Sequence, residues 1–266
     1  MSLINLEKKA RITLEKKGIL DEKINVVLAI DYSASMGSLY SKGIVSKIVE
    51  KLLAIGLNVD IDKSIDVYAF GNSSIPFGSV TSKNYQGFVE NEMLANNSLQ
   101  NTTNYAPVIK DISTDIFGSN VLNQFEPSVS VPKENKGFFK RLFSKEKEVA
   151  TPIKHPVTPA IDVTVPTLVF FITDGENFDE SKTRNVMQSV SPYPIFWQFV
   201  GIGNQSFRFL RELDEKLPNR AVDNANFFQL NDIENIPTEE LYDRILNEFP
   251  EWLIESRRLG ITPPKA

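Results

Sequence analysis

The stretch that decides the fold is "INVVLAIDYSAS" (24–35), an apolar run that ends abruptly in one aspartate and two serines. Short apolar runs rich in β-branched residues are typical of strands that are buried on both faces of a sheet. Three further runs of this kind are "IDVYAF" (65–70), "TLVFFIT" (167–173) and "IFWQFV" (195–200). We therefore expect four central strands, the first of which ends just before Asp31.

Helical patterns lie between and after these runs. Apolar residues recur at helical spacing from Ile44 to Leu53, and Gly56 is expected to end that helix. Further helices are expected over 179–190, over 206–213 starting at Ser206, and over 237–258 with a break at Pro250, and an edge strand is expected over 224–230. The alternation predicts an α/β fold with a doubly wound, mostly parallel sheet and helices on both faces, as in Rossmann-like proteins.

Composition narrows the classes of function. The chain has 266 residues, 41% of them hydrophobic, and a net charge of −5, which argues against a nucleic-acid binder that neutralises phosphates. The absence of cysteine excludes a disulfide framework, a thiolate nucleophile and a sulfur-ligated zinc site. The N-terminus lacks the apolar core of a secretory signal, and no stretch approaches the roughly 20 apolar residues of a membrane span. We therefore expect a cytoplasmic protein.

The chain divides into three expected parts. These are a helical extension over 1–20, a single domain over 21–255 and a tail over 256–266. Within the domain, recurring prolines from about 125 to 165 interrupt the strand and helix pattern, which indicates an inserted loop.

The inserted loop contains "KENKGFFKRLFSKEKE" (133–148), in which aromatic and basic residues are mixed. Four apolar residues in it would share one face of a helix: Phe138, Phe139, Leu142 and Phe143. Three interpretations stay open, namely a solvated charged loop, a surface that lies on an anionic membrane, and a helix that docks on a partner protein.

Oxygen-bearing side chains follow two of the predicted strands. Asp31, Ser33 and Ser35 form the pattern D-x-S-x-S, whose carboxylate and hydroxyl oxygens suit a hard divalent cation. Asp174, followed by Gly175, brings a second carboxylate to the same sheet edge, where such folds bind ligands. Helix capping and ordinary turn formation explain the first three residues equally well when they are taken alone.

A third polar segment, "NTTNYAPVIKDI" (101–112), precedes a helix expected to start near Pro107. Thr102 or Thr103 would present a hydroxyl there, although simple helix capping is the alternative. Glu176 and Asp179 lie near Asp174 in the sequence and would either extend the metal site or form a solvated acidic loop.

These three segments, in this order, resemble the metal-ion-dependent adhesion site of von Willebrand factor A domains. The resemblance implies that the hydroxyls of Ser33, Ser35 and Thr103 contact the metal and that Asp31 and Asp174 hold it directly or through water. It implies a divalent cation, Mg²⁺ first with Ca²⁺ or Mn²⁺ as alternatives, whose open position is filled by an acidic group of a partner protein.

More narrowly, the phrases "TNYAPVI", "PIFWQFVGIG", "VDNANFF" and "LYDRILNEFPEW" resemble the TerF-like bacterial proteins associated with tellurium resistance and stress responses. That resemblance implies a non-enzymatic, metal-dependent protein-binding module. The chain departs from the family pattern at Ala34 and at Asn101–Thr102, where glycines are common, and Thr102 therefore competes with Thr103 as the ligand.

Enzymatic alternatives find less support in the sequence. An aspartyl phosphotransferase needs a second carboxylate two residues after Asp31, where Ser33 stands. A serine hydrolase needs a base, and the only histidine is His155 in the insertion, with no G-x-S-x-G segment. The segment "GIGNQS" (201–206) falls short of a dinucleotide fingerprint. A metal-dependent hydrolase or phosphotransferase, or a membrane adaptor acting through 133–148, stays as the alternative.

Overall fold

One sheet of six strands forms the centre of the computed structural model, which describes residues 1–95, 97–122, 165–175, 177–231, 233 and 235–265. Its strands are β1 (Asn25–Asp31), β2 (Ser64–Phe70), β3 (Ser74–Thr81), β4 (Thr167–Thr173), β5 (Ile195–Ile202) and β6 (Ala225–Leu230). They lie in the order β3-β2-β1-β4-β5-β6, and every neighbouring pair is parallel except β2 with β3. The predicted doubly wound, mostly parallel sheet is confirmed.

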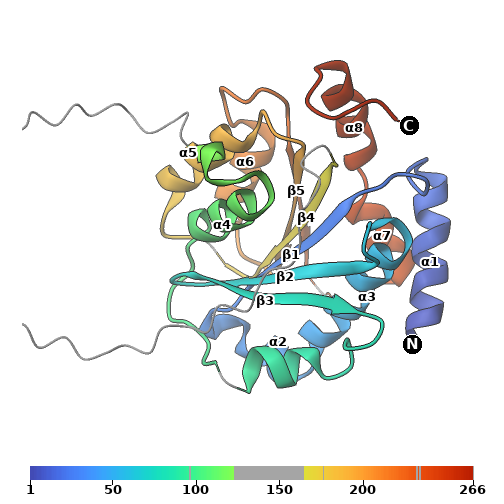
Figure 1. Ribbon diagram of the computed structural model, residues 1–266. Coiled ribbons are helices and arrows are strands. Elements are labelled where there is room, and N and C mark those ends of the chain that lie inside the picture. The colour runs from blue at the N-terminus through green and yellow to red at the C-terminus, as the bar shows by residue number, and fades with distance from the viewer. Residues whose placement is uncertain (96, 123–164, 176, 232, 234, 266) are drawn as a thin grey trace, which may run out of the picture.

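Helices cover both faces of the sheet (Figure 1). The helices are α1 (Leu3–Lys16), α2 (Gly37–Ser41), α3 (Ile44–Val59), α4 (Ala106–Phe117), α5 (Glu180–Val190), α6 (Arg208–Glu215), α7 (Thr238–Ile245) and α8 (Phe249–Arg258), with short helical turns η1 (Ala34–Met36), η2 (Val89–Leu94) and η3 (Ser119–Leu122). Buried residues of α1, α3, α7 and α8 form one core, and those of α4, α5 and α6 form the other.

Strand β1 shows why the sequences of the central strands contain apolar residues at consecutive positions. Val26 and Leu28 pack into the core on one face, whereas Val27 and Ala29 pack into the core on the other. Because successive side chains point to opposite faces, a strand covered on both sides has no solvent-facing position. Each fully buried aliphatic side chain contributes about 1.5–3 kcal/mol relative to exposure, so this strand fixes the centre of the molecule.

Two helix boundaries differ from the sequence expectations. Helix α3 continues to Val59, so the expectation that Gly56 ends it is wrong. A Cβ atom at Gly56 would lie 2.4 Å from the carbonyl oxygen of Ser64, and the glycine therefore lets the helix approach β2 closely. Helix α6 begins at Arg208 rather than at Ser206.

Two further parts of the structure also differ from the sequence expectations. The expected long closing helix is interrupted between α7 and α8, and Pro250 lies in the first turn of α8, where a proline costs no hydrogen bond. Strand β3 was not expected, because Pro76 and Gly78 are unfavourable in a strand interior. It forms the antiparallel edge of the sheet, with a register shift opposite it at Val67/Tyr68 that accommodates the irregular sequence.

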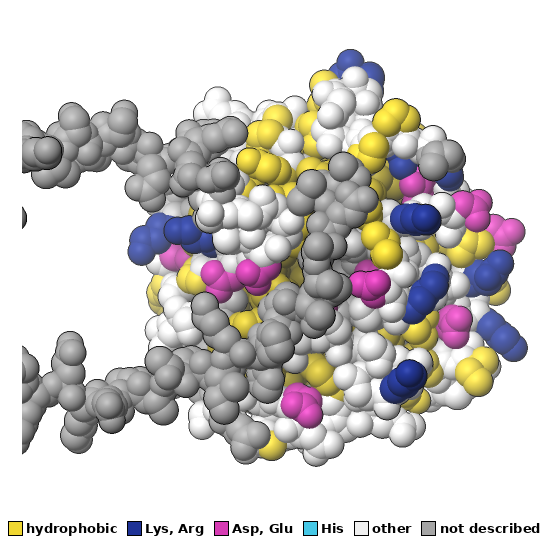
Figure 2. Space-filling view, viewed as in Figure 1, with side chains coloured by type: hydrophobic (Ala, Val, Ile, Leu, Met, Phe, Trp, Pro, Cys, Tyr) yellow, Lys and Arg dark blue, Asp and Glu magenta, His cyan; other side chains and the backbone are white. Residues whose placement is uncertain are grey.

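The inserted loop expected over 125–165, with the segment 133–148 and its four apolar residues, lies outside the described residues except for its last position. The expected division into extension, domain and tail also stays a prediction. Helix α1 is joined to α7 by ion pairs from Lys9 to Glu239 and from Lys17 to Asp243, and Figure 2 shows acidic and basic side chains interspersed on that side. Within the described ranges, no helix is long and apolar enough to cross a membrane.

A buried ion pair attaches α8 to the segment that leads into β1. Arg257 donates two hydrogen bonds, of 3.1 and 2.6 Å, to the carboxylate of Glu22, and Lys265 lies 3.3 Å from it. The Glu22 side chain is only 7% exposed. Burial alone would raise its pKa, but the hydrogen bonds and charges of Arg257 and Lys265 outweigh burial and hold the pKa below its usual value.

We expect Glu22→Gln to lower the free energy of unfolding by about 1–2 kcal/mol at pH 7, because it leaves the guanidinium of Arg257 without its charged partner. A lowered folded-state pKa contributes stability above the unfolded pKa of about 4.3 that is lost as the pH falls through the folded value. The difference between the two proteins should therefore shrink at about pH 3. Urea unfolding at both pH values measures it.

The matched control is Glu255→Gln, which removes the carboxylate of an exposed pair with Arg258. Its effect should be smaller, because exposed ion pairs contribute little. Equal losses for the two variants, or a loss at Glu22 that does not change with pH, would contradict the assignment.

Candidate metal centre

The carboxyl ends of β1 and β4 bring the two predicted aspartates to the same sheet edge. These strands are parallel neighbours, with Ile30 opposite Ile172, so the residues that follow each strand emerge side by side. Asp31 is the last residue of β1, and Asp174 directly follows β4. The sequence expectation about their placement rested on this geometry of parallel strands.

Short contacts join the side chains at this edge. The hydroxyl oxygens of Ser33 and Ser35 lie 2.9 Å apart, and the Ser35 hydroxyl donates to Asp174 Oδ1 at 2.8 Å. Asp31 Oδ1 accepts the backbone N–H of Ser33 at 2.8 Å, and the Thr173 hydroxyl donates to its Oδ2 at 2.6 Å. Four of the five predicted ligands therefore form one connected cluster, with Asp31 behind the serines.

Both carboxylates of the cluster hold a negative charge in surroundings that disfavour it. Asp31 is fully buried, and burial raises its pKa to about 6 despite hydrogen bonds from Ser33 and Thr173; the nearby charge of Asp174 raises the pKa further. Burial also raises the pKa of Asp174, against the hydrogen bond from Ser35. A cation between the two carboxylates would offset this cost.

Backbone hydrogen bonds fix the loop that carries Thr103, the fifth predicted ligand. Gln100 accepts from the Ala34 N–H at 2.9 Å, which places the loop alongside the first metal segment. The Phe178 N–H donates to the Thr103 carbonyl at 3.0 Å, which joins the same loop to the segment after Asp174. All three predicted segments are thus linked by main-chain contacts.

The two candidate threonines have different surroundings. Thr102 is exposed, and both its N–H and its hydroxyl donate to Asn72 Oδ1, at 2.9 and 2.6 Å. Thr103 is buried, and within the described part of the chain its side chain forms no hydrogen bond with the other four predicted ligands. The hydroxyl of Thr102 is therefore directed at Asn72, outside the predicted ligand set, which favours Thr103 as a ligand, although the assignment of the five ligands stays a prediction.

Asp179 has a different position from the one the sequence suggested. Its carboxylate accepts the backbone N–H groups of Tyr105 and Ala106, both at 2.9 Å, and also contacts Asn177 and Thr183 at 2.8 and 3.1 Å. It therefore caps the first turn of α4 from another segment instead of extending the metal site. Glu176 lies outside the described residues.

Three buried side chains that position the cluster were missed by sequence reasoning. Thr173 binds Asp31, the Tyr40 hydroxyl donates to the Asp31 carbonyl at 3.0 Å, and the Tyr105 hydroxyl donates to the Gly175 carbonyl at 2.7 Å. The T-D-G pattern places Thr173 next to a ligand, which is a usable signal. No sequence pattern around Tyr40 or Tyr105 indicates this role, because each tyrosine meets its acceptor only in the folded structure.

The donor set fits a small hard cation. All the predicted ligand atoms are carboxylate or hydroxyl oxygens, the types that Mg²⁺ and Ca²⁺ take. Hydrogen bonds already bring the oxygens of Ser33, Ser35 and Asp174 within 2.9 and 2.8 Å of one another, so these three residues would hold one ion together. Among the described residues, no three His, Asp or Glu side chains form a metal-holding group, so a site here relies on hydroxyls.

We expect Asp179→Asn to lower the free energy of unfolding by about 1–3 kcal/mol, because an amide oxygen accepts at one end only and leaves the N–H of Tyr105 or Ala106 without a partner. Denaturant unfolding measures the loss. Asp62→Asn is the control, since the Asp62 side chain is exposed and only its backbone N–H is hydrogen-bonded to Asp60. If both variants were as stable as the wild type, Asp179 would not be the cap of α4.

Comparison with known proteins places the chain in a family. A family model described as "vWA found in TerF C terminus" matches residues 23–125 and 133–262. The uncharacterized protein YcbR of Bacillus subtilis (strain 168) is 32% identical over 264 residues, which cover 98% of this chain and 90% of that protein.

Solved structures with a similar fold include proximal thread matrix protein 1 from the mussel byssus, determined with a zinc-occupied MIDAS motif. It is 11% identical, with a TM-score of 0.48, over 85% of this chain and 48% of that one. The chain thus spans about half the length of the mussel protein. The SpRpn10 VWA domain is 10% identical, with a TM-score of 0.45, over 84% of this chain and 95% of that domain.

Proposed function

The chain belongs to the von Willebrand factor A family, in its TerF-like group, and we propose that it is a non-enzymatic module that binds another protein through a divalent cation. The observation that carries the proposal is the contact of Ser33, Ser35 and Asp174 oxygens at the carboxyl edge of β1 and β4. The proposal includes a cytoplasmic location, which is the expectation from the sequence, and a role in bacterial tellurium resistance or stress response, which rests on the family resemblance alone.

In this proposal each residue has a defined task. The hydroxyls of Ser33, Ser35 and Thr103 and the carboxylate of Asp174 present oxygens to the ion, and Asp31 acts from behind, through water and through its hydrogen bond to the Ser33 N–H. A bound divalent cation supplies an electrophilic coordination position. The partial exposure of Asp174 and the exposure of Ser35 leave the outer side of the cluster open, so that an acidic group of the partner can reach that position.

The all-oxygen donor set and the family resemblance support Mg²⁺ as the ion. Ca²⁺ is one alternative, because it also takes carboxylate and hydroxyl oxygens. Mn²⁺ stays an alternative, because it takes the same oxygen donors.

The position of Asp31 argues against covalent catalysis on this sheet. A nucleophilic carboxylate must reach the substrate, but Asp31 is fully buried and both of its oxygens accept hydrogen bonds, from the Ser33 N–H and the Thr173 hydroxyl. A covalent phosphotransferase mechanism with Asp31 as the nucleophile would therefore need this carboxylate to leave its site.

We expect isothermal titration calorimetry to detect Mg²⁺ binding by the wild type, and to show at least about tenfold weaker binding for Asp31→Ala and Asp174→Ala. Thr103→Ala should weaken binding, whereas Thr102→Ala should not, because the Thr102 hydroxyl is held by Asn72. Mg²⁺ affinities of Asp31→Ala and Asp174→Ala equal to the wild type would show that the ion does not bind at this centre.

We also expect no turnover in a phosphatase and nucleotidase screen with Mg²⁺ or Mn²⁺. Asp31→Ala is the matched control, because any hydrolysis by contaminating enzymes would be the same in both preparations. A rate for the wild type that exceeds that of the variant would establish catalysis at this site and replace the proposed binding function.

A further inference from the structure

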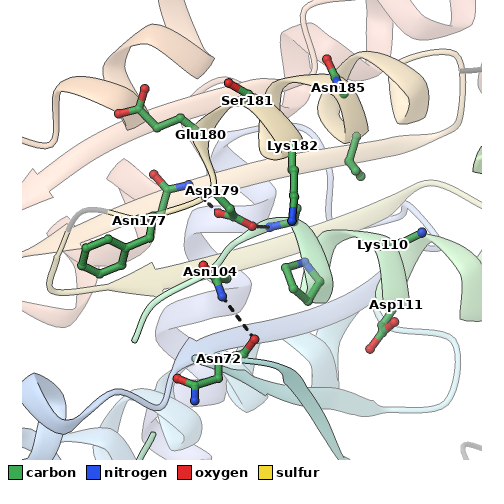
Figure 3. Close-up of a pocket in the computed structure, with 14 residues that line it drawn as sticks. Asn72, Asn104, Lys110, Asp111, Asn177, Asp179, Glu180, Ser181, Lys182 and Asn185 are labelled. Carbon is green, nitrogen blue, oxygen red and sulfur yellow. Dashed lines mark hydrogen bonds between the residues drawn. The ribbon is translucent and has the colours of Figure 1, made fainter. Parts of the chain in front are cut away.

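A groove with a volume of about 1030 Å³ lies between the N-terminal halves of α4 and α5, beside the loop that follows Asp174 (Figure 3). We propose that this groove binds an extended, acidic segment of the partner protein, adjacent to the residue whose carboxylate reaches the metal. The inference rests on the proposed function, because it places the rest of the partner's segment next to that carboxylate.

The groove is continuous with the metal centre along the chain. Asn177 and Phe178 line it, three and four residues after Asp174, and Asn104 lines it directly after Thr103. The hydrogen bond from the Phe178 N–H to the Thr103 carbonyl joins the two walls directly at Thr103, a predicted metal ligand. A peptide that reaches the metal cluster would therefore have this part of the groove beside it.

The free charges of the groove are positive. Lys110 on α4 and Lys182 on α5 line it, are exposed, and form no ion pair within the described residues (Figure 3). The acidic side chains beside them are engaged: Glu180 pairs with Arg184 at 2.9 Å, Asp179 caps α4, and Asp111 also has an interaction partner. Two unpaired ammonium groups on opposite walls favour carboxylates between them.

The groove also offers hydrogen-bonding groups suited to a peptide main chain. Asn177 is 8% exposed; its Nδ2 donates to Asp179, but its Oδ1 has no partner among the described residues. A buried acceptor without a partner is energetically unfavourable, so a donor from the ligand would be favourable there. An extended segment has free backbone N–H groups, whereas a helix has used most of its own, which is why we favour an extended ligand.

Phe178 supplies an apolar contact at the groove. Its side chain is 80% exposed, the largest exposed fraction among the large hydrophobic residues of the described chain. An exposed aromatic ring in the wall of a groove offers an apolar surface on which a side chain of the partner can pack. We therefore expect the acidic segment to carry an apolar side chain that packs on this ring.

The test selects a displayed library of short random peptides on the wild-type protein with Mg²⁺, and then measures capture of the selected pool by variants. We expect the pool to be enriched in Asp and Glu. The charge reversal Lys110→Glu/Lys182→Glu should reduce capture at least about tenfold, and Phe178→Ser should also reduce it. Mg²⁺ binding by calorimetry should be unchanged in these variants.

Matched controls are Lys83→Glu and Ile254→Ser, which change an exposed lysine and an exposed hydrophobic residue outside the groove. Both should capture the pool as the wild type does. A pool without acidic enrichment, or full capture by the groove variants, would overturn the inference. If Asp174→Ala loses capture while the groove variants retain it, the inference about the groove is wrong and the proposed metal function stands. If capture needs the groove residues but not Mg²⁺, the proposed metal function is wrong instead.

Discussion

The parallel pairing of β1 with β4 is the constraint on which the rest of the structure depends. From β1 the chain builds the sheet outward through β2 to β3, and from β4 it builds in the opposite direction through β5 to β6. The loops that follow β1 and β4 therefore leave the sheet toward opposite faces, at the point where the strand order reverses. Asp31 and Asp174 lie at this point because each directly ends or follows one of these two strands.

The same arrangement makes the centre electrostatically unfavourable without an ion. Asp31 ends a strand that is buried along its whole length, so its carboxylate is stabilised by neutral donors, Thr173 and the Ser33 N–H, and no lysine or arginine in the described chain hydrogen-bonds to it. The raised pKa of Asp31 is the consequence. Rigid loops keep the cluster together against this cost, and the cap that Asp179 places on α4 is one of the contacts that hold them.

The sequence predicts those features of the structure that are determined by neighbouring residues in the chain. The central strands and the positions of Asp31 and Asp174 are encoded in uninterrupted apolar runs and in the residues that end them, so pattern alone locates them. Strand β3 forms because β2 pairs with it, although its own residues disfavour a strand. The role of Gly56 depends on a close approach to another element, and the choice between Thr102 and Thr103 depends on Asn72, thirty residues away.

The proposed metal and peptide sites are adjacent, because one short segment contributes to both. The chain from Asp174 to Asp179 begins with a predicted ligand of the ion, continues through Asn177 and Phe178 in the wall of the groove, and ends with the cap of α4. Phe178 in turn holds the Thr103 loop through its N–H. A peptide that binds this wall would therefore also contact the segments that carry two predicted metal ligands, and because linkage is reciprocal, the ion would strengthen peptide binding by the same free energy with which the peptide strengthens ion binding. Specificity for an acidic partner then comes from the groove and the ion acting together, since neither the two lysines nor the cation alone distinguishes one carboxylate-bearing segment from another.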